Sequence, residues 1–396
     1  MISPTVVCSA PEKHDAMLFE SFFLAGFECS THRRRDRRRV DIIRDTQHDV
    51  LAERDYHTVN KLGLRTVRDG IRWHLIESRP GRYDWSSVLP MIRAARRAGV
   101  QVIWDLFHYG WPDDLDIFTP AFVARFGKLA RAFAGLIKNE TDQTCFFAPV
   151  NEPSFVSWAG GDEGFIYPFA KGRDWDIKTQ LIRAAIEAIE NIWEVIPGAR
   201  IVQCEPAIHI EPNPKRPDDA EPAEQYRRAQ FQALDMLVGN VAPELGGRRE
   251  YLDILGLNFY YNNEWVNFGE TLYAFHPKYR PLQNIIQEFY DRYRRPLFLS
   301  ETGIEGMFRP AWLAYVCAEV RCALDRGVPV EGICLYPIAN HPGWENERHC
   351  HNGLLDYPDE FGNREMYTPL ARELKYQQLI FEHFFESDLA ADRQYA

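Results

Sequence analysis

Residues 146–153, FFAPVNEP, decide how this chain folds. The segment begins as an apolar run, which predicts a buried parallel strand, and it stops abruptly at an Asn-Glu-Pro turn that contains Glu152. Residues 296–303, PLFLSETG, repeat this design, because an apolar run is followed at once by Glu301. Two glutamates at the ends of two buried strands predict paired carboxylates on one rim of a barrel.

The rest of the chain alternates apolar runs of strand length with longer amphipathic segments. Runs rich in Val, Ile, Leu and Phe are typical of a sheet that is buried on both faces. The predicted strands cover residues 21–28, 64–70, 100–107, 146–153, 200–205, 251–259, 296–303 and 330–336. The predicted helices cover roughly residues 49–62, 86–98, 120–138, 177–195, 221–238, 282–293, 309–326 and 368–385.

Eight β-α units in succession predict a (β/α)8 TIM barrel of the α/β class. We expect residues 1–396 to form a single catalytic domain, with a short lead at residues 1–16 and an exposed tail at residues 387–396. A doubly wound sheet is the alternative architecture. It usually opens with a Gly-rich phosphate loop, and the chain contains neither G-x-G-x-x-G nor a Walker motif.

Composition excludes several classes of partner. The net charge of −11 gives no global field that would attract nucleic acid or an anionic membrane. The eight cysteines are scattered without a C-x-x-C pair, which fits a reducing cytosol, and no secretory signal is recognisable. We therefore predict a cytoplasmic protein without a nucleic-acid or membrane partner.

Paired carboxylates on one barrel rim are typical of glycosidic bond cleavage. One carboxyl group protonates the leaving oxygen, and the other attacks the anomeric carbon or activates water. The alternative for each glutamate alone is structural: Glu152 and Glu301 would cap the following helix or bind a loop arginine. Two such residues with specific neighbours favour the chemical interpretation.

These motifs resemble the clan A retaining glycoside hydrolases, and the family 1 β-glycosidases most closely. The resemblance rests on the Asn-Glu-Pro and Ser-Glu-Thr-Gly strand ends and on further segments in barrel order along most of the chain. These segments are FLAGFECST (23–31), TVRDGIRW (66–73), LFHYGWP (106–112), ILGLNFYY (254–261) and HNGLLDYPDEFGNRE (351–365).

The resemblance implies specific roles for the two glutamates. Glu152 would be the general acid/base, and Glu301 would be the nucleophile that forms a glycosyl-enzyme, about 5–5.5 Å from Glu152. It also implies a substrate-binding set around them, in which Asn151 would bond the sugar 2-hydroxyl and Arg68 would keep Glu301 ionised. The other implied members of this set are His108, Tyr260, which competes with Tyr261, and Asn258.

The sequence departs from the family pattern near strands seven and eight. Thr302 stands where the family has Asn after the nucleophile, and Tyr336 stands where it has Trp. The family glutamate that binds the distal sugar hydroxyls has no certain equivalent. Glu345 is the candidate, with Trp344 as a platform for sugar stacking; ordinary loop roles are the alternative for both. These departures affect the substrate more than the reaction.

Two unusual clusters remain. The basic run HRRRDRRR (32–39) predicts a solvated surface, or else binding of an anionic substrate group by Arg33, Arg34 or Arg35. The His-Cys-His sequence at 349–351 could suggest a metal site, but the corresponding family loop binds none. We therefore predict neither a metal nor a cofactor.

The leading hypothesis is a retaining, exo-acting β-glycosidase that resembles β-glucosidases and β-galactosidases and acts on a small-molecule or oligosaccharide glycoside. Transglycosylation would be a variant of the same mechanism. The alternative is a catalytically weak carbohydrate-binding or regulatory barrel, because a fold does not guarantee an activity. The sequence leaves the sugar, the linkage and the oligomeric state open.

Overall fold

The computed structural model describes residues 17–394, and it describes side chains through residue 387. The predicted lead at residues 1–16 and the side chains of the predicted tail at 388–396 lie outside the described part. Within residues 17–394, no helix is long and apolar enough to cross a membrane.

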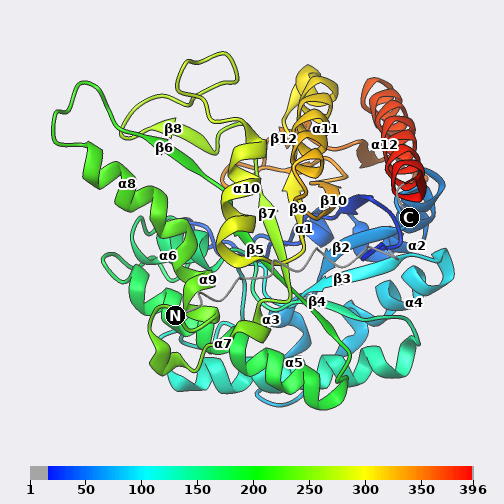
Figure 1. Ribbon diagram of the computed structural model, residues 1–396. Helices are drawn as coiled ribbons and strands as arrows, with labels where there is room; N and C mark the ends of the chain where they lie inside the picture. Colours follow the sequence, from blue (N-terminus) through cyan, green and yellow to red (C-terminus); the bar gives the residue numbers. More distant parts are fainter. Residues whose placement is uncertain (1–16, 395–396) are drawn as a thin grey trace, which may run out of the picture.

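Eight parallel strands close into a barrel, as predicted (Figure 1). Around the barrel their order is β1-β10-β9-β7-β5-β4-β3-β2, and β1 pairs with both β2 and β10. The barrel strands are β1 (Phe23–Gly26), β2 (Thr66–Gly70), β3 (Gln101–Asp105), β4 (Phe146–Ala148), β5 (Arg200–Pro206), β7 (Ile254–Asn258), β9 (Leu297–Thr302) and β10 (Val330–Leu335).

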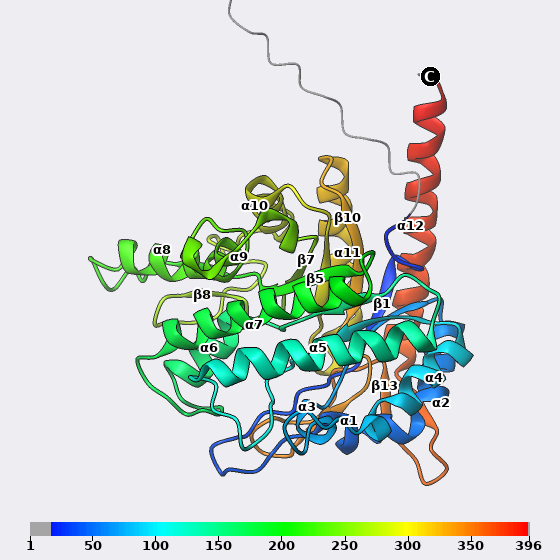
Figure 2. The same ribbon diagram turned by 90° about the horizontal axis from the view of Figure 1, so that it is seen from below.

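The helices lie on the outside of the barrel (Figure 1, Figure 2). All eight predicted helical segments are present, and α12 extends past the barrel to the C-terminal end (Figure 2). The helices are α1 (Ile42–Asp45), α2 (His48–Lys61), α3 (Trp73–Ile76), α4 (Leu89–Ala98), α5 (Pro120–Glu140), α6 (Pro153–Gly161), α7 (Asp174–Val195), α8 (Ala220–Arg228), α9 (Gln232–Leu237), α10 (Leu282–Tyr293), α11 (Arg309–Asp325) and α12 (Thr368–Gln394).

Side chains of each strand alternate between two apolar layers, which explains the continuous apolar runs. Phe146 and Phe298 belong to the cluster that fills the barrel, whereas Phe147, Leu297 and Leu299 pack in the larger core that includes the helices. Because both layers are apolar, the strands show no polar alternation. The polar residues gather at the strand ends.

Three features differ from the predicted pattern. The predicted helix at 221–238 tightens into a 3-10 turn at Ala229–Phe231, which separates α8 from α9. There the buried Gln230 side chain donates to the carbonyl of Arg227, which an uninterrupted α-helix would use for the N–H of residue 231. The helix α6 and the short helices α1 and α3 were not predicted. Short strand pairs also form outside the barrel: β6 (His209–Glu211) with β8 (Glu264–Val266), β11 (His341–Pro342) with β12 (His349–Cys350), and β13 (Leu355–Pro358) with β14 (Arg364–Met366).

A buried ionic network joins α2 to the barrel. His48 contacts Asp55 through Nδ1 at 2.7 Å and Asp69 of β2 through Nε2 at 2.8 Å. Arg364 donates to Asp55 from the far end of the chain, and Tyr56 donates to Asp69 at 2.5 Å. Burial opposes a charge on His48, but the two aspartates outweigh burial and raise the pKa of His48 to about 9.

This network predicts a pH-dependent contribution to stability. Because the folded pKa of His48 lies above the unfolded value near 6.5, its contribution is complete below about pH 6.5 and is lost as the pH rises to about 9. We expect the difference in unfolding free energy between wild type and His48→Gln to shrink by on the order of 3 kcal/mol between pH 6 and pH 9.5. Urea unfolding at both pH values measures it, and an unchanged difference contradicts the prediction.

Candidate active site

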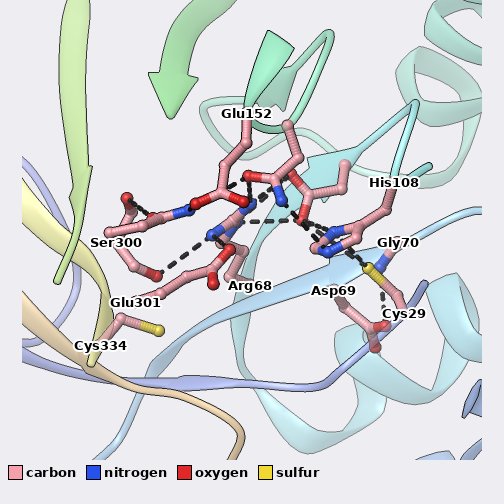
Figure 3. Close-up of polar contacts among 12 residues, drawn as sticks. Cys29, Arg68, Asp69, Gly70, His108, Glu152, Ser300, Glu301 and Cys334 are labelled. Atoms are coloured by element: carbon pink, nitrogen blue, oxygen red, sulfur yellow. Dashed lines mark hydrogen bonds and ion pairs between the residues drawn. The ribbon is translucent and has the colours of Figure 1, made fainter. Parts of the chain in front are cut away.

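Glu152 and Glu301 both reach the carboxyl-terminal mouth of the barrel. Glu301 is the last residue but one of β9. Glu152 follows β4 and is the residue immediately before α6. Glu152 has φ 46°, and its side chain does not cap α6, so the structural alternative of helix capping does not hold for Glu152. Both side chains are buried and point toward Arg68, which lies between them (Figure 3).

Arg68 of β2 connects the two glutamate-bearing strands. Its Nη1 donates to Glu301 Oε1 at 2.7 Å and to the Ser300 carbonyl at 3.2 Å. Its Nη2 donates to Asn151 Oδ1 at 2.6 Å, and its Nε lies 3.0 Å from Asp105 Oδ2. Arg68 is completely buried, so these partners are required to offset the loss of its hydration.

Each glutamate has a different set of partners. Glu301 accepts from Arg68 and, at 2.7 Å, from the hydroxyl of Tyr260, while the competing Tyr261 is exposed. Glu152 forms no ion pair with any described residue. Its Oε1 accepts from Asn258 Nδ2 at 2.9 Å, and its Oε2 accepts from the Tyr109 hydroxyl.

Burial raises the pKa of both glutamates. The pKa of Glu301 is raised to about 7, because burial and the neighbouring charge of Glu152 outweigh the guanidinium of Arg68. The pKa of Glu152 is also raised, chiefly by burial, although the hydrogen bonds from Tyr109 and Asn258 lower it. Two neighbouring carboxyl groups whose pKa values are both raised can share a single proton. The direct contact with Arg68 favours the ionised form of Glu301.

The predicted residue His108 lies in a polar cluster beside this pair. Its Nε2 is 3.1 Å from Asn151 Nδ2, and its Nδ1 is 3.4 Å from Asp105 and 3.2 Å from the Cys29 sulfur. Glu28 lies 3.8 Å from its Nε2. Burial opposes protonation of His108, but Asp105 and Glu28 outweigh burial and raise its pKa.

The predicted sugar-binding segment after β10 is only partly brought to the site. Trp344 packs edge-to-face against Tyr109, with ring centroids 5.5 Å apart, and against His32 at 5.0 Å. The buried atoms Trp344 Nε1 and His32 Nδ1 have no hydrogen-bond partner among the described residues. Glu345 is exposed and makes no hydrogen bond or ion pair within residues 17–394, so it does not join the cluster.

The two family departures have structural counterparts. The hydroxyl of Thr302 accepts from Trp312 Nε1 at 2.9 Å, which fixes the start of the segment after Glu301. The ring of Tyr336 lies under the guanidinium of Arg68 at 5.4 Å. A Cβ on Gly26 would come within 2.1 Å of this ring, so only glycine fits there.

The basic run is largely paired within the chain. Arg33 binds Asp113, and Arg34 binds Asp36 and lies 3.5 Å from Glu347. Arg35 is exposed. A cavity of about 350 Å³ opens beside the run, and its lining includes Arg34, Arg38, Arg39 and Arg44. The pairing favours the solvated-surface interpretation of this run.

Two groups of described residues have side chains close enough to hold a metal ion: Cys29 with Asp105 and His108, and His349 with His351 and Asp356. In the first group, Asp105 is already bound to Arg68. In the second, the exposed His349 contacts Asp356 at 3.3 Å, and Asp356 also accepts from Asn340. Hydrogen bonds and ion pairs thus account for the geometry of both groups.

Sequence reasoning missed several members of this site. Tyr109, Asp105 and Glu28 come from the ends of β3 and β1, the strands next to β2 in the barrel. The signal was available for Tyr109, because it follows His108 directly in LFHYGWP. For Asp105 and Glu28 the predicted barrel places the strand ends near Arg68, but the sequence does not show which way their side chains point.

The buried position of Arg68 predicts a large stability cost on its removal. Arg68→Met leaves Asp105 and Glu301 buried without their cation, which we expect to lower the unfolding free energy by roughly 3–5 kcal/mol at neutral pH. The control is Arg97→Met, which removes a salt bridge to Glu53 between half-exposed side chains and is expected to have little effect. Urea unfolding of the two variants provides the measurement, and equal losses contradict the prediction.

Comparison with known proteins supports the same fold. No family model matches the chain. A β-galactosidase from Sulfolobus acidocaldarius is 24% identical over 314 residues, which cover 66% of this chain but only 62% of that protein. A Thermotoga maritima β-glucosidase in complex with glucoimidazole superposes with a TM-score of 0.75 at 15% identity, covering 92% of this chain and 98% of that one. A family 1 β-glucosidase from the same organism gives 0.69 at 16% identity, covering 83% and 86%. The predicted resemblance to family 1 β-glycosidases is thus confirmed, and the chain has their (β/α)8 barrel fold.

Proposed function

We propose that this protein is a β-glycosidase that hydrolyses O-glycosidic bonds with retention of configuration. The observation that carries the proposal is the pair of buried carboxyl groups, Glu152 and Glu301, which converge from β4 and β9 on Arg68. The β-galactosidase and β-glucosidase relatives support the substrate class. We place the enzyme in the cytoplasm, because its seven described cysteines are free.

The proposed reaction has two steps. Glu301 attacks the anomeric carbon while Glu152 gives its proton to the leaving oxygen, so that a covalent glycosyl-enzyme forms and the aglycone leaves. Glu152, now ionised, then takes a proton from water, which attacks the anomeric carbon and releases the sugar and Glu301. Transglycosylation would follow the same course with a sugar hydroxyl in place of water.

The hydrogen-bond partners of the two glutamates support these roles. Arg68 and Tyr260 hold the Glu301 carboxylate in place with two hydrogen bonds, which suits a nucleophile that must be ionised. Glu152 has only neutral donors, Tyr109 and Asn258, which suits a group that changes its protonation state twice in each cycle. Asn151, whose oxygen accepts from Arg68, is the proposed partner of the sugar 2-hydroxyl.

The proposed enzyme is exo-acting and binds one terminal sugar. Polar side chains beside the glutamates support binding of a sugar: His108 contacts Asn151, and His32 packs against Trp344, each of these two rings having a buried nitrogen without a hydrogen-bond partner in the part of the chain that the structure describes. Structures of similar fold contain glucoimidazole or castanospermine. The alternative, a barrel that binds carbohydrate without cleaving it, has no need for an opposed acid and nucleophile.

Aryl β-glycosides test the assignment directly. We expect Glu152→Ala and Glu301→Ala to lower kcat/KM by roughly 10²–10⁴-fold or more, and a 2-fluoro sugar to label Glu301 covalently in the wild type. Glu264→Gln is the control, since it alters a buried carboxyl of β8 outside the barrel. Cleavage of no aryl glycoside in either anomer, or a label on another residue, overturns the proposal.

The raised pKa of Glu301 predicts the acidic limb of the pH profile. Because the nucleophile must be ionised, kcat/KM should fall as the pH decreases through about 7. Replacing Glu152 by Gln removes the negative charge that raises this pKa, so the limb should move to lower pH. A dinitrophenyl glycoside, which needs little acid assistance, allows both profiles to be measured. An acidic limb at pH 4–5 in the wild type contradicts the prediction.

A further inference from the structure

Tyr109 is connected to Arg68 and Glu152 by a chain of hydrogen bonds in which the donor and the acceptor of each bond can be assigned. Arg68 donates to Asn151 Oδ1 at 2.6 Å, so the amide nitrogen of Asn151 must be the atom that faces the Tyr109 hydroxyl at 3.0 Å. That nitrogen can only donate. The Tyr109 oxygen therefore accepts from Asn151, and its own hydrogen is donated to Glu152 Oε2.

The second oxygen of Glu152 is fixed in the same way. Ser300 donates to Asn258 Oδ1 at 2.6 Å, which turns the Asn258 amide nitrogen toward Glu152 Oε1 at 2.9 Å. Both oxygens of Glu152 thus accept hydrogen bonds. This arrangement matches the ionised carboxyl group, which has no proton to donate.

The backbone holds this pair in unusual conformations. Tyr109 has φ 70° and Glu152 has φ 46°, so both lie in the left-handed region that side chains other than glycine rarely adopt. The backbone after Tyr109 packs tightly against Thr31, because a Cβ on Gly110 would lie 2.1 Å from the Thr31 hydroxyl oxygen. Strained residues that hydrogen-bond to each other in a reactive site suggest that the chain maintains this contact for function.

Ring contacts limit the movement of Tyr109. Its centroid lies 4.5 Å from that of His108 and 5.4 Å from that of Phe155, which is in the first turn of α6, the helix that follows Glu152. Trp344 covers another side of the ring at 5.5 Å. The hydroxyl therefore stays within reach of Glu152 while the carboxyl group changes its protonation state.

We propose that Tyr109 positions Glu152 and stabilises its carboxylate when Glu152 acts as the general base of the second step. The inference rests on the proposed function. In the first step Glu152 gives its proton to the leaving oxygen, and the Tyr109 hydroxyl then donates to the new carboxylate. In the second step Glu152 takes the proton of water. Tyr109 keeps its own proton throughout, in line with a pKa that burial raises well above the ordinary value.

Tyr109→Phe removes only the hydroxyl group. The loss of a hydrogen bond to the charged form should raise the pKa of Glu152, so the basic limb of kcat/KM should move upward by about one pH unit. The higher pKa alone would make Glu152 a stronger base, but Glu152 also loses the contact that positions it toward water. Hydrolysis of the glycosyl-enzyme should therefore slow about tenfold, which lowers both kcat and KM for a dinitrophenyl glycoside. An unchanged basic limb with an unchanged kcat in this variant overturns the inference.

Tyr293→Phe is the matched control. It also removes a buried tyrosine hydroxyl that bonds a carboxylate, Asp235 at 3.1 Å, but it does so on α10, outside the barrel mouth. Its pH profile should equal that of the wild type. If it shifts the basic limb as Tyr109→Phe does, the effect is general to the fold and the inference fails.

A readout without substrate separates this inference from the proposed function. Infrared titration of the carboxyl band, assigned by its loss in Glu152→Gln, gives the pKa of Glu152 directly in wild type and in Tyr109→Phe. We expect the higher value in the variant even if no glycoside is cleaved, and equal values overturn the inference. Should Tyr109→Phe fail to fold, 3-fluorotyrosine at position 109 keeps the ring and strengthens the donor, so the pKa of Glu152 should fall; a value equal to or above that of the wild type overturns the inference.

Discussion

The buried guanidinium of Arg68 is the interaction on which the rest of the site depends. Removing a cation from water is unfavourable, and here several acceptors compensate for it: Asp105, Asn151, Glu301 and the carbonyl of Ser300. These acceptors come from β3, β9 and the turn after β4, so one side chain determines the mutual position of three strand ends. The planar fork of arginine, with its five N–H donors, is suited to this task, whereas lysine offers a single donor group.

Asymmetry around Arg68 distinguishes two otherwise similar glutamates. Both are buried and both have a raised pKa, so their own depth in the barrel does not separate the acid from the nucleophile. The separation comes from their partners. A direct cation contact favours the charged form of Glu301, while neutral hydroxyl and amide donors leave Glu152 closer to a balance between its two forms.

Two residues at the mouth of the barrel have strained backbone conformations. Tyr109 and Glu152 adopt left-handed backbone conformations where the chain leaves β3 and β4. Such conformations persist only if the surrounding packing determines them. Here the contacts of Gly110 with Thr31 and of Phe155 with Tyr109 provide that packing.

The sequence by itself determined the barrel and the pair of glutamates at its mouth. Eight apolar runs and eight amphipathic segments are local patterns, and Glu152, Glu301, Arg68 and Tyr260 stand in local motifs at strand ends, where a parallel barrel gathers its polar groups. Only the tertiary structure decided which further residues contact them. Tyr109 meets Glu152 from the neighbouring strand β3, and Glu28 approaches His108 from the far side of β2, contacts that depend on the conformations of the turns after these strands. Glu345, the candidate for binding distal sugar hydroxyls, is exposed in the structure. Its position could not be predicted, because the conformation of a long loop depends on packing against distant parts of the chain.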